Sequence, residues 1–322
     1  MSRLSNVKTL HRAKTAGEFG RVAVLLGGDS SEREISLLSG NAVLAALKRR
    51  GVDAHAFDPR DKPVNALREE KFDRAWTILH GPGGEDGLIQ GALEWLGIPY
   101  TGSGVLASAL TMDKLKTKRV VIGAGIAAPE YAVLANAADL PAALSRVGLP
   151  MMVKPSSQGS SVGITKVKTA EQLPVAFREA NAVDPIVFAE SFIDGPEFTV
   201  GVLVDEALPS IRIQPATEFY DYQAKYFRDD TQYYCPSGID AGAEKQLQAM
   251  ALAAFGATDC SGWGRVDFMR DSRTGAFYFI EINTTPGMTD HSLVPKAAQQ
   301  VGIDFEELVW RVLETSFTRV PT

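Results

Sequence analysis

Two short segments in the C-terminal part of the chain alternate polar with apolar residues. The first is residues 264–268 (GRVDF) and the second is residues 279–283 (FIEIN). A period of two is typical of a half-buried strand, and residues 271–275 between the segments offer a hairpin turn with glycine at a left-handed position. Pairing Ser272 with Ala276 sets the register of the predicted hairpin. The chain must therefore fold so that one polar hairpin face meets solvent or a ligand.

That register gathers charged and amide side chains on one face of the hairpin. Asp267 lies opposite Glu281, and Arg265 lies opposite Asn283. Two carboxylates held close together are unfavourable unless a cation neutralises them, and Mg²⁺ prefers all-oxygen ligands that include one or two carboxylates with substrate phosphates. The alternative is an ordinary hairpin with a solvated polar face. The turn that follows, residues 283–287 (NTTPG), favours the metal site.

The overall composition excludes several classes of protein. A chain of 322 residues is long enough for two or three domains, and 45% hydrophobic with 22% charged residues is ordinary for a globular protein. The net charge of −6, with no basic run longer than residues 48–50, argues against a nucleic-acid partner. Residues 1–21 lack the apolar core of a signal peptide, and no apolar run approaches the roughly 20 residues that span a bilayer. We therefore expect a cytoplasmic protein without a membrane partner.

The two cysteines, Cys235 and Cys260, have no metal-ligand spacing and make a poor disulfide scaffold. This pattern fits a reducing compartment. We interpret both as packing or surface residues.

The N-terminal part alternates strands with helices. In chain order, the periodicity predicts a strand at 22–26, a helix at 32–50, strands at 53–57 and 75–79, and a helix at 87–96. This order is typical of a parallel sheet covered by helices, whose ligands collect at the carboxyl ends of the strands. Those ends carry Gly27 and Gly28, with Glu32 close behind, and the glycine-rich segment 80–87. Residues 1–20 have no clear periodicity and are expected to form a loose extension.

The middle of the chain contains a strand, a loop of small residues and a second strand. The strands are expected at 151–155 and 164–167, with the loop at 156–163. Backbone amides of such a loop could cover a polyphosphate, and Lys154 would add a positive charge. A flexible surface hairpin is the alternative.

Two other motifs are matched only loosely. Residues 159–163 fit the Gly-x-Ser-x-Gly nucleophile pattern, for which His291 could serve as the base, but that pattern requires a helix after the serine. β-Branched residues follow here, so a serine hydrolase is disfavoured. Residues 102–107 resemble a dinucleotide fingerprint without the strand and acidic residue that should follow it.

The remaining elements complete the expected organisation. Helices are predicted at 112–126, 243–257 and 305–317, and strands at 185–190 and 197–203. A new domain is expected to begin near Lys118. Residues 215–236 are aromatic and polar with little periodicity, and a stretch of that kind in a compact domain is often a functional lid.

A set of motifs in a fixed order carries a family resemblance. These motifs are residues 26–28 (LGG), 31–36 (SEREIS), 79–81 (LHG), 84–87 (GEDG), 100–104 (YTGSG), 112–114 (MDK), 159–163 (GSSVG), 195–198 (GPEF), 220–222 (YDY), 224–226 (AKY), the Arg265 and Asp267 strand, and residues 281–292. With these motifs the chain resembles the D-alanine–D-alanine ligase family of the ATP-grasp superfamily. The resemblance extends from Val22 almost to the C-terminus.

The resemblance implies a fold of mixed class, α/β and α+β. It would consist of an extension at 1–20, an N-terminal parallel α/β substrate domain at 21–117, and two ATP-gripping α+β subdomains. These are a central lid domain at 118–200 and a C-terminal catalytic domain at 201–322. ATP and D-alanine are the implied small-molecule substrates, with two Mg²⁺ ions that Mn²⁺ could replace. A cytoplasmic homodimer in peptidoglycan precursor synthesis is implied as well.

The resemblance also implies roles for individual residues. ATP would be bound by Lys114, Lys154, Ser160, Ser161, Glu190, Ser191, Phe192, Ile193, Glu197, Lys225 and Asn283. The metal ligands would be Asp267, Glu281 and Asn283, in agreement with the hairpin register. The substrates would contact Glu32, His80, Arg265, Gly287, Ser292 and Leu293. Glu32, Ser160, Tyr226, Arg265 and Gly287 would take part in catalysis.

Some features leave the exact acceptor open. Gln158 and Ser191 stand where an acidic residue and a lysine are frequent in the family, and they would alter nucleotide affinity at most.

A D-lactate or D-serine ligase keeps the same enzyme class, and a catalytically silent nucleotide-binding regulator is a third reading. By resemblance Tyr226 would reach Ser160, itself linked to Glu32, and close the lid. Tyrosine at this place favours dipeptide synthesis, so Tyr226→Phe is predicted to lower dipeptide formation and admit D-lactate.

Overall fold

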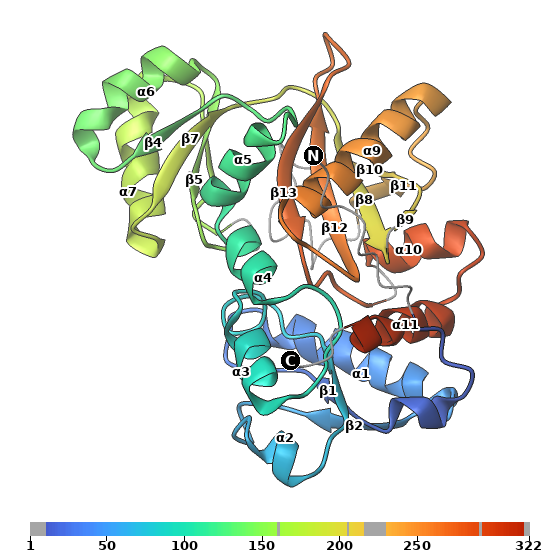
Figure 1. The fold of residues 1–322 in the computed structure, drawn as a ribbon. Coiled ribbons are helices and arrows are strands. Elements are labelled where there is room, and N and C mark those ends of the chain that lie inside the picture. The colour runs from blue at the N-terminus through green and yellow to red at the C-terminus, as the bar shows by residue number, and fades with distance from the viewer. Residues whose placement is uncertain (1–10, 160–161, 205, 216–229, 290–291, 319–322) are drawn as a thin grey trace, which may run out of the picture.

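The computed structural model describes residues 11–159, 162–204, 206–215, 230–289 and 292–318. The elements form three lobes, each built on its own β-sheet (Figure 1). The N-terminal lobe lies at the bottom of the view, the central lobe at the upper left and the C-terminal lobe at the upper right. The predicted fold class, α/β combined with α+β, is confirmed. Within the described ranges, no helix is long and apolar enough to cross a membrane.

The N-terminal lobe contains the predicted parallel sheet, which has three strands in the order β2-β1-β3. Its elements are β1 (Arg21–Leu25), α1 (Arg33–Arg49), β2 (Asp53–Phe57), α2 (Ala66–Glu69), β3 (Arg74–Thr77) and α3 (Leu88–Leu96). The central strand β1 is apolar after its first residue and is buried there, which explains its place between the other two. The carboxyl ends of β1 and β3 lead into the two glycine-rich segments.

The central lobe is a four-stranded antiparallel sheet in the order β4-β7-β5-β6. Its elements are β4 (Tyr131–Leu134), η2 (Ala137–Asp139), α6 (Leu140–Val147), β5 (Met151–Pro155), β6 (Thr165–Val167), η3 (Ala170–Gln172), α7 (Leu173–Val183) and β7 (Val187–Ser191). Both α6 and α7 carry proline in the first turn, where its missing N–H costs no hydrogen bond. The two helices and the sheet enclose a hydrophobic core of their own, so this lobe is packed as a separate unit.

The C-terminal lobe is built on a six-stranded sheet in the order β11-β10-β8-β12-β13, with β9 paired to β8. Its elements are β8 (Glu197–Leu203), β9 (Glu206–Ala207), β10 (Ile211–Gln214), β11 (Gln232–Tyr234), α9 (Ala241–Ala257), β12 (Trp263–Arg270), β13 (Phe277–Asn283), α10 (Leu293–Gln300), α11 (Phe305–Glu314) and η4 (Thr315–Thr318). The apolar spacing of α9 predicts that Leu247, Met250, Ala251 and Ala254 face inward; Leu247, Ala251 and Ala254 are buried in the core of this lobe, and Met250 is partly buried against it.

The β12–β13 hairpin has the predicted pairs on its polar face. Asp267 pairs with Glu281 and Arg265 pairs with Asn283. Because Asp267 also pairs with Thr199 of β8, the polar face lies in the interior of the sheet and not at an edge.

The turn of the same hairpin differs from the prediction. Asp271, and not Ser272, lies opposite Ala276, and the Asp271 amide donates to the Ala276 carbonyl at 2.9 Å. A β-bulge then adds Ile280 as an extra residue in β13, which shifts the register by one residue. The predicted pairs are therefore correct because the bulge compensates for a wrong turn register.

The helix expected at 112–126 is present as α5 (Lys114–Gly123), and it is preceded by α4 (Val105–Met112), which was not predicted. Asp113 separates them because its side chain accepts a hydrogen bond from the Lys116 amide at 2.9 Å and caps the start of α5. The sequence analysis also missed α10, whose short apolar face was not recognised.

The expectation of a loose N-terminal extension is wrong for residues 11–20. They end in the short helix η1 (Ala16–Phe19), and the Phe19 side chain is fully buried. Its ring centroid lies 4.8 Å from that of Trp310 and 5.3 Å from that of Phe317. The buried Phe19 ring anchors the segment, and one aromatic residue leaves no periodic signal in the sequence.

A continuous hydrophobic cluster joins the N-terminal and C-terminal lobes. The rings of Trp76 in β3 and Trp263 in β12 lie 5.3 Å apart within it. Helix α11 covers the same cluster and packs against α1. These two lobes therefore share one core, whereas the central lobe does not contribute to it.

Candidate active site

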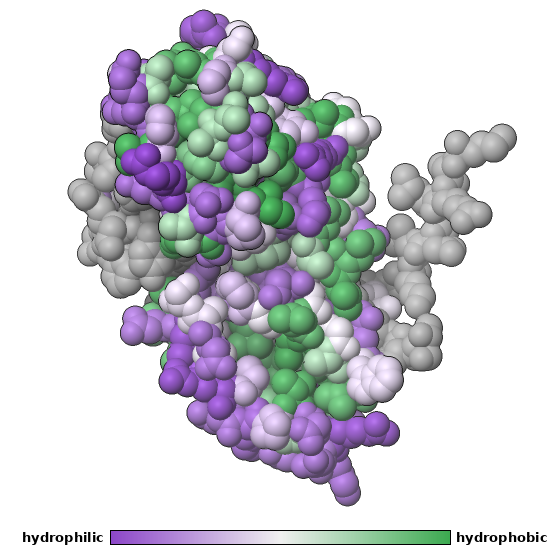
Figure 2. All heavy atoms as spheres, turned by 90° about the vertical axis from the view of Figure 1, so that its left-hand side faces the viewer, coloured by the Kyte–Doolittle hydropathy of each residue, from purple (hydrophilic) through white to green (hydrophobic). Residues whose placement is uncertain are grey.

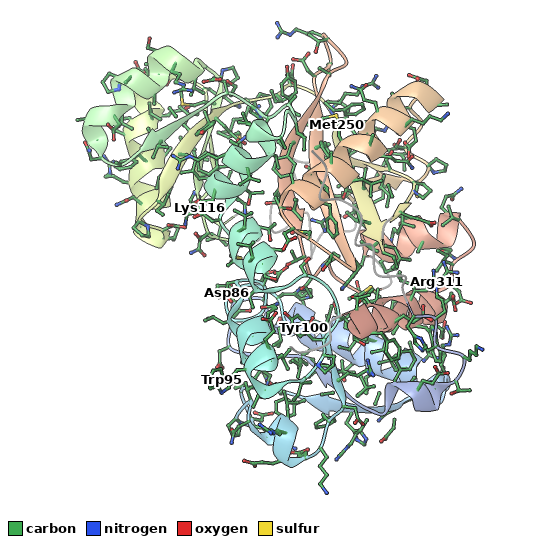
Figure 3. All side chains as sticks on the ribbon, in the orientation of Figure 1. Asp86, Trp95, Tyr100, Lys116, Met250 and Arg311 are labelled. Carbon is green, nitrogen blue, oxygen red and sulfur yellow. The ribbon has the colours of Figure 1, made fainter. Side chains whose placement is uncertain are left out.

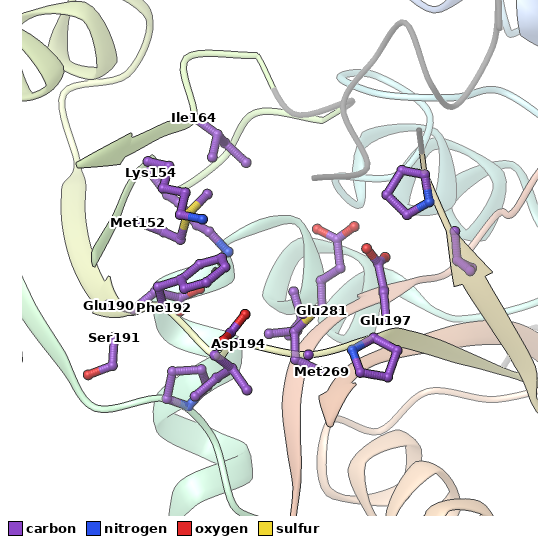
Figure 4. Close-up of a pocket in the computed structure, with 18 of the residues that line it drawn as sticks. Met152, Lys154, Ile164, Glu190, Ser191, Phe192, Asp194, Glu197, Met269 and Glu281 are labelled. Atoms are coloured by element: carbon purple, nitrogen blue, oxygen red, sulfur yellow. Dashed lines mark ion pairs between the residues drawn. The ribbon is translucent and has the colours of Figure 1, made fainter. Parts of the chain in front are cut away.

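A cavity of about 380 Å³ lies between the central and C-terminal lobes (Figure 4). On one side its walls come from β5, from Ile164 and β6, and from β7. On the other side they come from β8, β10, β12 and β13. The linker 192–196 between β7 and β8 forms one edge, and the start of α5 reaches the cavity as well. The volume is within the range of pockets that bind cofactor-sized ligands.

Both lobes contribute apolar side chains to this cavity. Met152 and Ile164 come from the central lobe, and Met269 and Ile280 come from the C-terminal lobe. The backbone of the linker 192–196 adds peptide groups at the edge. A flat heteroaromatic ring suits such a slot, because its faces contact apolar atoms while its edge meets hydrogen-bonding groups.

A buried carboxylate in the wall of the cavity is shared by two lysines. Lys154 Nζ lies 2.5 Å from Glu190 Oε1, and Lys118 Nζ lies 2.8 Å from Glu190 Oε2. Burial opposes ionisation of Glu190, but the charges of Lys118 and Lys154 outweigh it and lower its pKa to about 2. Glu190 is therefore an ionised hydrogen-bond acceptor at neutral pH.

The carboxylate of Asp267 is fully surrounded on the polar face of the hairpin. Arg265 donates to both of its oxygens, with Nε 2.9 Å from Oδ1 and Nη2 2.8 Å from Oδ2. Thr199 Oγ1 donates at 2.6 Å, and Asn283 Nδ2 donates at 3.1 Å. These contacts fix the direction in which the guanidinium of Arg265 points.

The second carboxylate of this face, Glu281, lines the cavity. Its Oε2 lies 3.2 Å from Lys114 Nζ, which also donates to the Gln158 carbonyl at 2.8 Å. Figure 4 shows Glu281 and Glu197 on the side of the cavity opposite Lys154 and Glu190.

The donor set of this face fits a magnesium ion. Asp267, Glu281 and Asn283 supply oxygens from neighbouring strands, and cationic side chains bind both carboxylates in this structure. Among the described residues, no group of three or more histidine, cysteine, aspartate or glutamate side chains is placed to hold a metal. Further ligands would therefore come from substrate oxygens and water, as is usual for Mg²⁺.

A second group of titratable residues lies where the N-terminal lobe meets the C-terminal lobe. Glu85 accepts hydrogen bonds from the amides of Gly81 at 2.8 Å and Thr285 at 3.3 Å. Burial, with the charge of Glu32 acting in the same direction, raises the pKa of Glu85 to about 8. Burial also lowers the pKa of His80 to about 4, so its imidazole is neutral at pH 7.

His80 is also the clearest unsatisfied polar group of this region. Its Nε2 is buried and has no hydrogen-bond partner in the part of the chain that the structure describes. A buried polar atom of this kind is uncommon in a folded protein and points to a bound ligand or water.

Two glycines permit close approaches around this region. A side-chain carbon at Gly159 would lie 2.4 Å from Glu32 Oε1, so a larger residue there would require the Glu32 side chain to move. A side-chain carbon at Gly287 would lie 2.9 Å from Ser292 Oγ. Ser292 is the N-cap residue of α10, which places the Leu293 amide at a helix N-terminus.

The structure brings the predicted site residues into two adjoining groups. The residues that line the cavity are Lys114, Lys154, Glu190, Ser191, Phe192, Ile193, Glu197 and Glu281. Those between the N-terminal and C-terminal lobes are Glu32, His80, Arg265, Gly287, Ser292 and Leu293, and Asp267 and Asn283 are hydrogen-bonded to each other on β12 and β13 beside Arg265. Ser160, Ser161, Lys225, Tyr226 and His291 lie outside the described residues.

Three side chains of the site were missed by the sequence analysis. Glu85 belongs to a quoted motif but received no role, and Thr199 gave no signal at all. Lys118 lies four residues after Lys114, and this spacing puts both lysines on one face of α5. That spacing was the available clue.

A cofactor-sized cavity between two α+β lobes, with paired carboxylates at its end and a parallel α/β lobe beyond, defines an enzyme of the ATP-grasp class. Residues 55–103 match the family described as D-ala D-ala ligase N-terminus, and residues 120–314 match the one described as D-ala D-ala ligase C-terminus. The chain belongs to the D-alanine–D-alanine ligase family.

Similar proteins of known sequence cover almost the whole chain. It is 55% identical over 298 residues to the D-alanine–D-alanine ligase B of Chromobacterium violaceum, which covers 92% of this chain and 98% of the relative. It is 54% identical over 298 residues to the D-alanine–D-alanine ligase of Laribacter hongkongensis, covering 92% of this chain and 96% of the relative.

Solved structures are similar over the same extent. The D-alanine–D-alanine ligase of Bacillus anthracis matches with a TM-score of 0.83 and 36% identity, covering 92% of this chain and 97% of that one. A structure of the Bacillus anthracis enzyme complexed with ATP matches with a TM-score of 0.81 and 33% identity over the same shares. The VanG D-Ala:D-Ser ligase of Enterococcus faecalis matches with a TM-score of 0.79 and 30% identity, covering 92% and 99%.

Proposed function

We propose that this protein joins two D-alanine molecules into D-alanyl-D-alanine, with cleavage of ATP to ADP and phosphate, in peptidoglycan precursor synthesis. The observation that carries the proposal is the continuity of the site across three lobes. The cavity leads to the carboxylates of Asp267 and Glu281, and these adjoin the group around Glu32 and His80. Identities of 54% and 55% to relatives named as D-alanine–D-alanine ligases support the same activity.

ATP would occupy the cavity between the central and C-terminal lobes. Glu190 would accept a hydrogen bond from the amino group of adenine, and the backbone of 191–193 would meet the ring edge. Glu197 would take the ribose hydroxyls. The ammonium groups of Lys114 and Lys154 would bind the phosphates, because both line the same cavity.

Further phosphate contacts are proposed from residues outside the described ranges. Ser160, Ser161 and Lys225 would bind the phosphates from the loop of the central lobe and from the lid. Asn283 would contact the nucleotide through its amide.

Asp267, Glu281 and Asn283 would hold two Mg²⁺ ions, which Mn²⁺ could replace. When bound, these ions would neutralise charge that develops on the transferred phosphoryl group. The protein contributes the fixed direction of the carboxylates, which Arg265 and Lys114 hold in this structure.

The first step would activate a carboxylate that is otherwise a poor acyl donor. An oxygen of the first D-alanine's carboxylate attacks the γ-phosphorus of ATP, and the bond from that phosphorus to the β-γ bridging oxygen breaks. ADP leaves, and the product is D-alanyl phosphate. Glu32 would pair with the ammonium of this substrate beside the neutral imidazole of His80, so the carboxylate points toward the cavity.

The second step would form the peptide bond. The deprotonated amine of the second D-alanine attacks the carbonyl carbon, and the resulting oxyanion would accept hydrogen bonds from Arg265 and the Gly287 amide. The C–O bond then breaks, the nitrogen loses a proton, and phosphate leaves carrying that proton. Ser292 and the Leu293 amide at the start of α10 would bind the carboxylate of the second D-alanine.

Closure of the site is proposed to depend on Glu32, Ser160 and Tyr226. Hydrogen bonds among them would join three parts of the chain and exclude water from the acyl phosphate. The glycine at 159 supports the approach of this loop to Glu32.

A homodimer in the cytoplasm completes the proposal. Leu88 and Trp95 on α3 and Leu106 on α4 are 69%, 90% and 65% exposed. Trp95 projects outward from the N-terminal lobe (Figure 3), and apolar side chains spread over this lobe in the view of that side (Figure 2). Exposed apolar patches of this kind often mark protein interfaces. A monomeric mass by light scattering at micromolar concentration would contradict the dimer.

Phosphate release from ATP tests the activity. We expect release with D-alanine but not with L-alanine, and a product with the mass of the D-alanyl-D-alanine dipeptide. Competition among D-alanine, D-serine and D-lactate as the second substrate distinguishes the three ligase activities by product mass. Nucleotide binding without phosphate release for any of these substrates would favour the silent regulator instead.

A further inference from the structure

We propose that Lys118 is a positioning residue for nucleotide recognition. It holds Glu190 in place for the amino group of adenine. When Lys154 binds the phosphates, Lys118 alone neutralises the Glu190 carboxylate. This inference rests on the adenine role proposed for Glu190.

The two lysines on Glu190 have different access to the cavity. Lys154 lines it, whereas Lys118 is 1% exposed and lies behind the wall. Lys118 Nζ contacts Glu190 Oε2 at 2.8 Å and also donates to the Pro129 carbonyl at 3.4 Å. Because Glu190 and Pro129 both line the cavity, Lys118 holds two parts of its wall without touching a ligand.

Glu190 has two ammonium partners, although one would neutralise its charge. A polyphosphate has more negative charge than Glu190 and competes for Lys154, which is the lysine that can reach it. Without Lys118, Glu190 would then be a buried carboxylate with no cation beside it. Such a group takes up a proton or turns toward solvent, and in either case it no longer accepts a hydrogen bond in the cavity.

Helix α5 explains how this arrangement is built. Lys114 and Lys118 are four residues apart, so both project from the same face of the helix. Lys114 reaches Glu281 in the C-terminal lobe, and Lys118 reaches Glu190 in the central lobe. One helix therefore directs a lysine to each of the two walls between which the nucleotide would bind.

A nucleotide whose base lacks the amino group can test whether Lys118 positions Glu190 or only stabilises the fold. Inosine diphosphate carries a carbonyl oxygen where ADP carries the amino group. We expect the ratio of the dissociation constants of IDP and ADP to fall about tenfold in Lys118→Met, since a hydrogen bond to a charged acceptor is lost. Arg119→Met removes an exposed charge from the same helix and should leave the ratio as in the wild type.

The outcomes distinguish this inference from the proposal on which it rests. If the wild type binds ADP and IDP equally well, Glu190 does not read the amino group, and the adenine role itself fails. If the wild type prefers ADP and Lys118→Met keeps the full preference, the role of Lys118 is refuted while that of Glu190 stands.

A double variant covers the case in which Lys118→Met does not fold. Glu190→Gln combined with Lys118→Met removes the buried pair without leaving a lone charge. If Lys118 acts through Glu190, the double variant should show the same IDP to ADP ratio as Glu190→Gln alone. A further fall of the ratio in the double variant would mean that Lys118 acts by another route.

Discussion

Glu85 accepts a hydrogen bond from the backbone amide of Thr285, which lies 200 positions later in the chain, at 3.3 Å. The same carboxyl group accepts from the Gly81 amide at 2.8 Å. It thereby connects the loop after β3 to the turn after β13. Burial and the Glu32 charge raise the pKa of Glu85 to about 8, although both amides favour its ionised form.

This raised pKa predicts a loss of stability at alkaline pH. In the folded protein Glu85 holds its proton up to about pH 8, whereas in the unfolded chain it loses it near 4.5. Its contribution is therefore complete below pH 4.5 and is lost as the pH rises through 8, at a cost on the order of 1 kcal/mol between pH 7 and pH 9. Glu85→Gln should flatten the fall of the melting temperature in this window.

Other groups with shifted pKa values are shared by the wild type and the variant, including Cys260, whose raised pKa lowers stability from about pH 9 upward. His80 has a lowered pKa and adds stability as the pH rises from about 4 to 6.5, below the window. Glu179→Gln changes an exposed glutamate on α7 and serves as the control. A Glu85→Gln protein with the same slope as the wild type would show that Glu85 is ionised in the fold.

Removal of the Glu281 charge should abolish ligation. Glu281→Gln keeps the shape of the side chain but removes one of two carboxylates proposed to bind metal, so we expect phosphate release to fall at least about a hundredfold. The melting temperature should change little, because the Glu281 side chain lines the cavity, where it is 16% exposed, and its lost partner, Lys114, also donates to Gln158. Wild-type turnover at saturating Mg²⁺ would contradict the assignment. Asp267→Asn should act in the same direction but less severely on catalysis, since Glu281 remains.

Neither cysteine is expected to take part in the reaction. Burial raises the pKa of Cys260 to about 11, so it is a thiol and a poor nucleophile at pH 7. Cys235 also has a raised pKa because of burial. The double variant Cys235→Ser, Cys260→Ala should retain turnover within about twofold of the wild type. Lost turnover in a variant with an unchanged melting temperature would overturn this reading.

The hairpin illustrates how far the sequence alone can lead. Strand alternation identified the face of Asp267 and Glu281 because one side of the sheet is buried and the other is polar. The turn was misplaced, since nothing local reveals that Ile280 forms a bulge. The correct pairs resulted from two deviations that cancel.

Contacts between segments that are distant in the sequence could not be predicted from its periodicity. Lys118 and Glu190 are separated by a whole subdomain in sequence, and each alone looks like a solvated charge. Their pairing, like that of Glu85 with Thr285, depends on how separate lobes pack. The order of the motifs could predict the class of enzyme, but not these buried partners.

The structure of residues 11–20 was also not predicted from the sequence. Arg12 Nη1 contacts Glu314 Oε2 at 2.9 Å, and the amide of Ala13 donates to Glu314 Oε1 at 2.9 Å. The buried guanidinium of Arg74 donates to the Phe19 carbonyl at 2.6 Å. All these partners lie outside the segment, so a polar stretch that looks like a tail is attached to both α11 and β3.

This attachment predicts that Phe19 contributes to stability but not to nucleotide binding. Phe19→Ala removes a fully buried ring from between Trp310 and Phe317, which should cost about 3–5 kcal/mol of the free energy of unfolding. The KM for ATP should stay within about twofold, because the cavity lies between the other two lobes. Gly17→Ala, where the added carbon meets nothing within 4 Å, is the matched control and should melt like the wild type. Urea denaturation of the three proteins measures the difference, and a loss below about 1 kcal/mol in Phe19→Ala would mean that the segment packs more loosely than its buried ring implies.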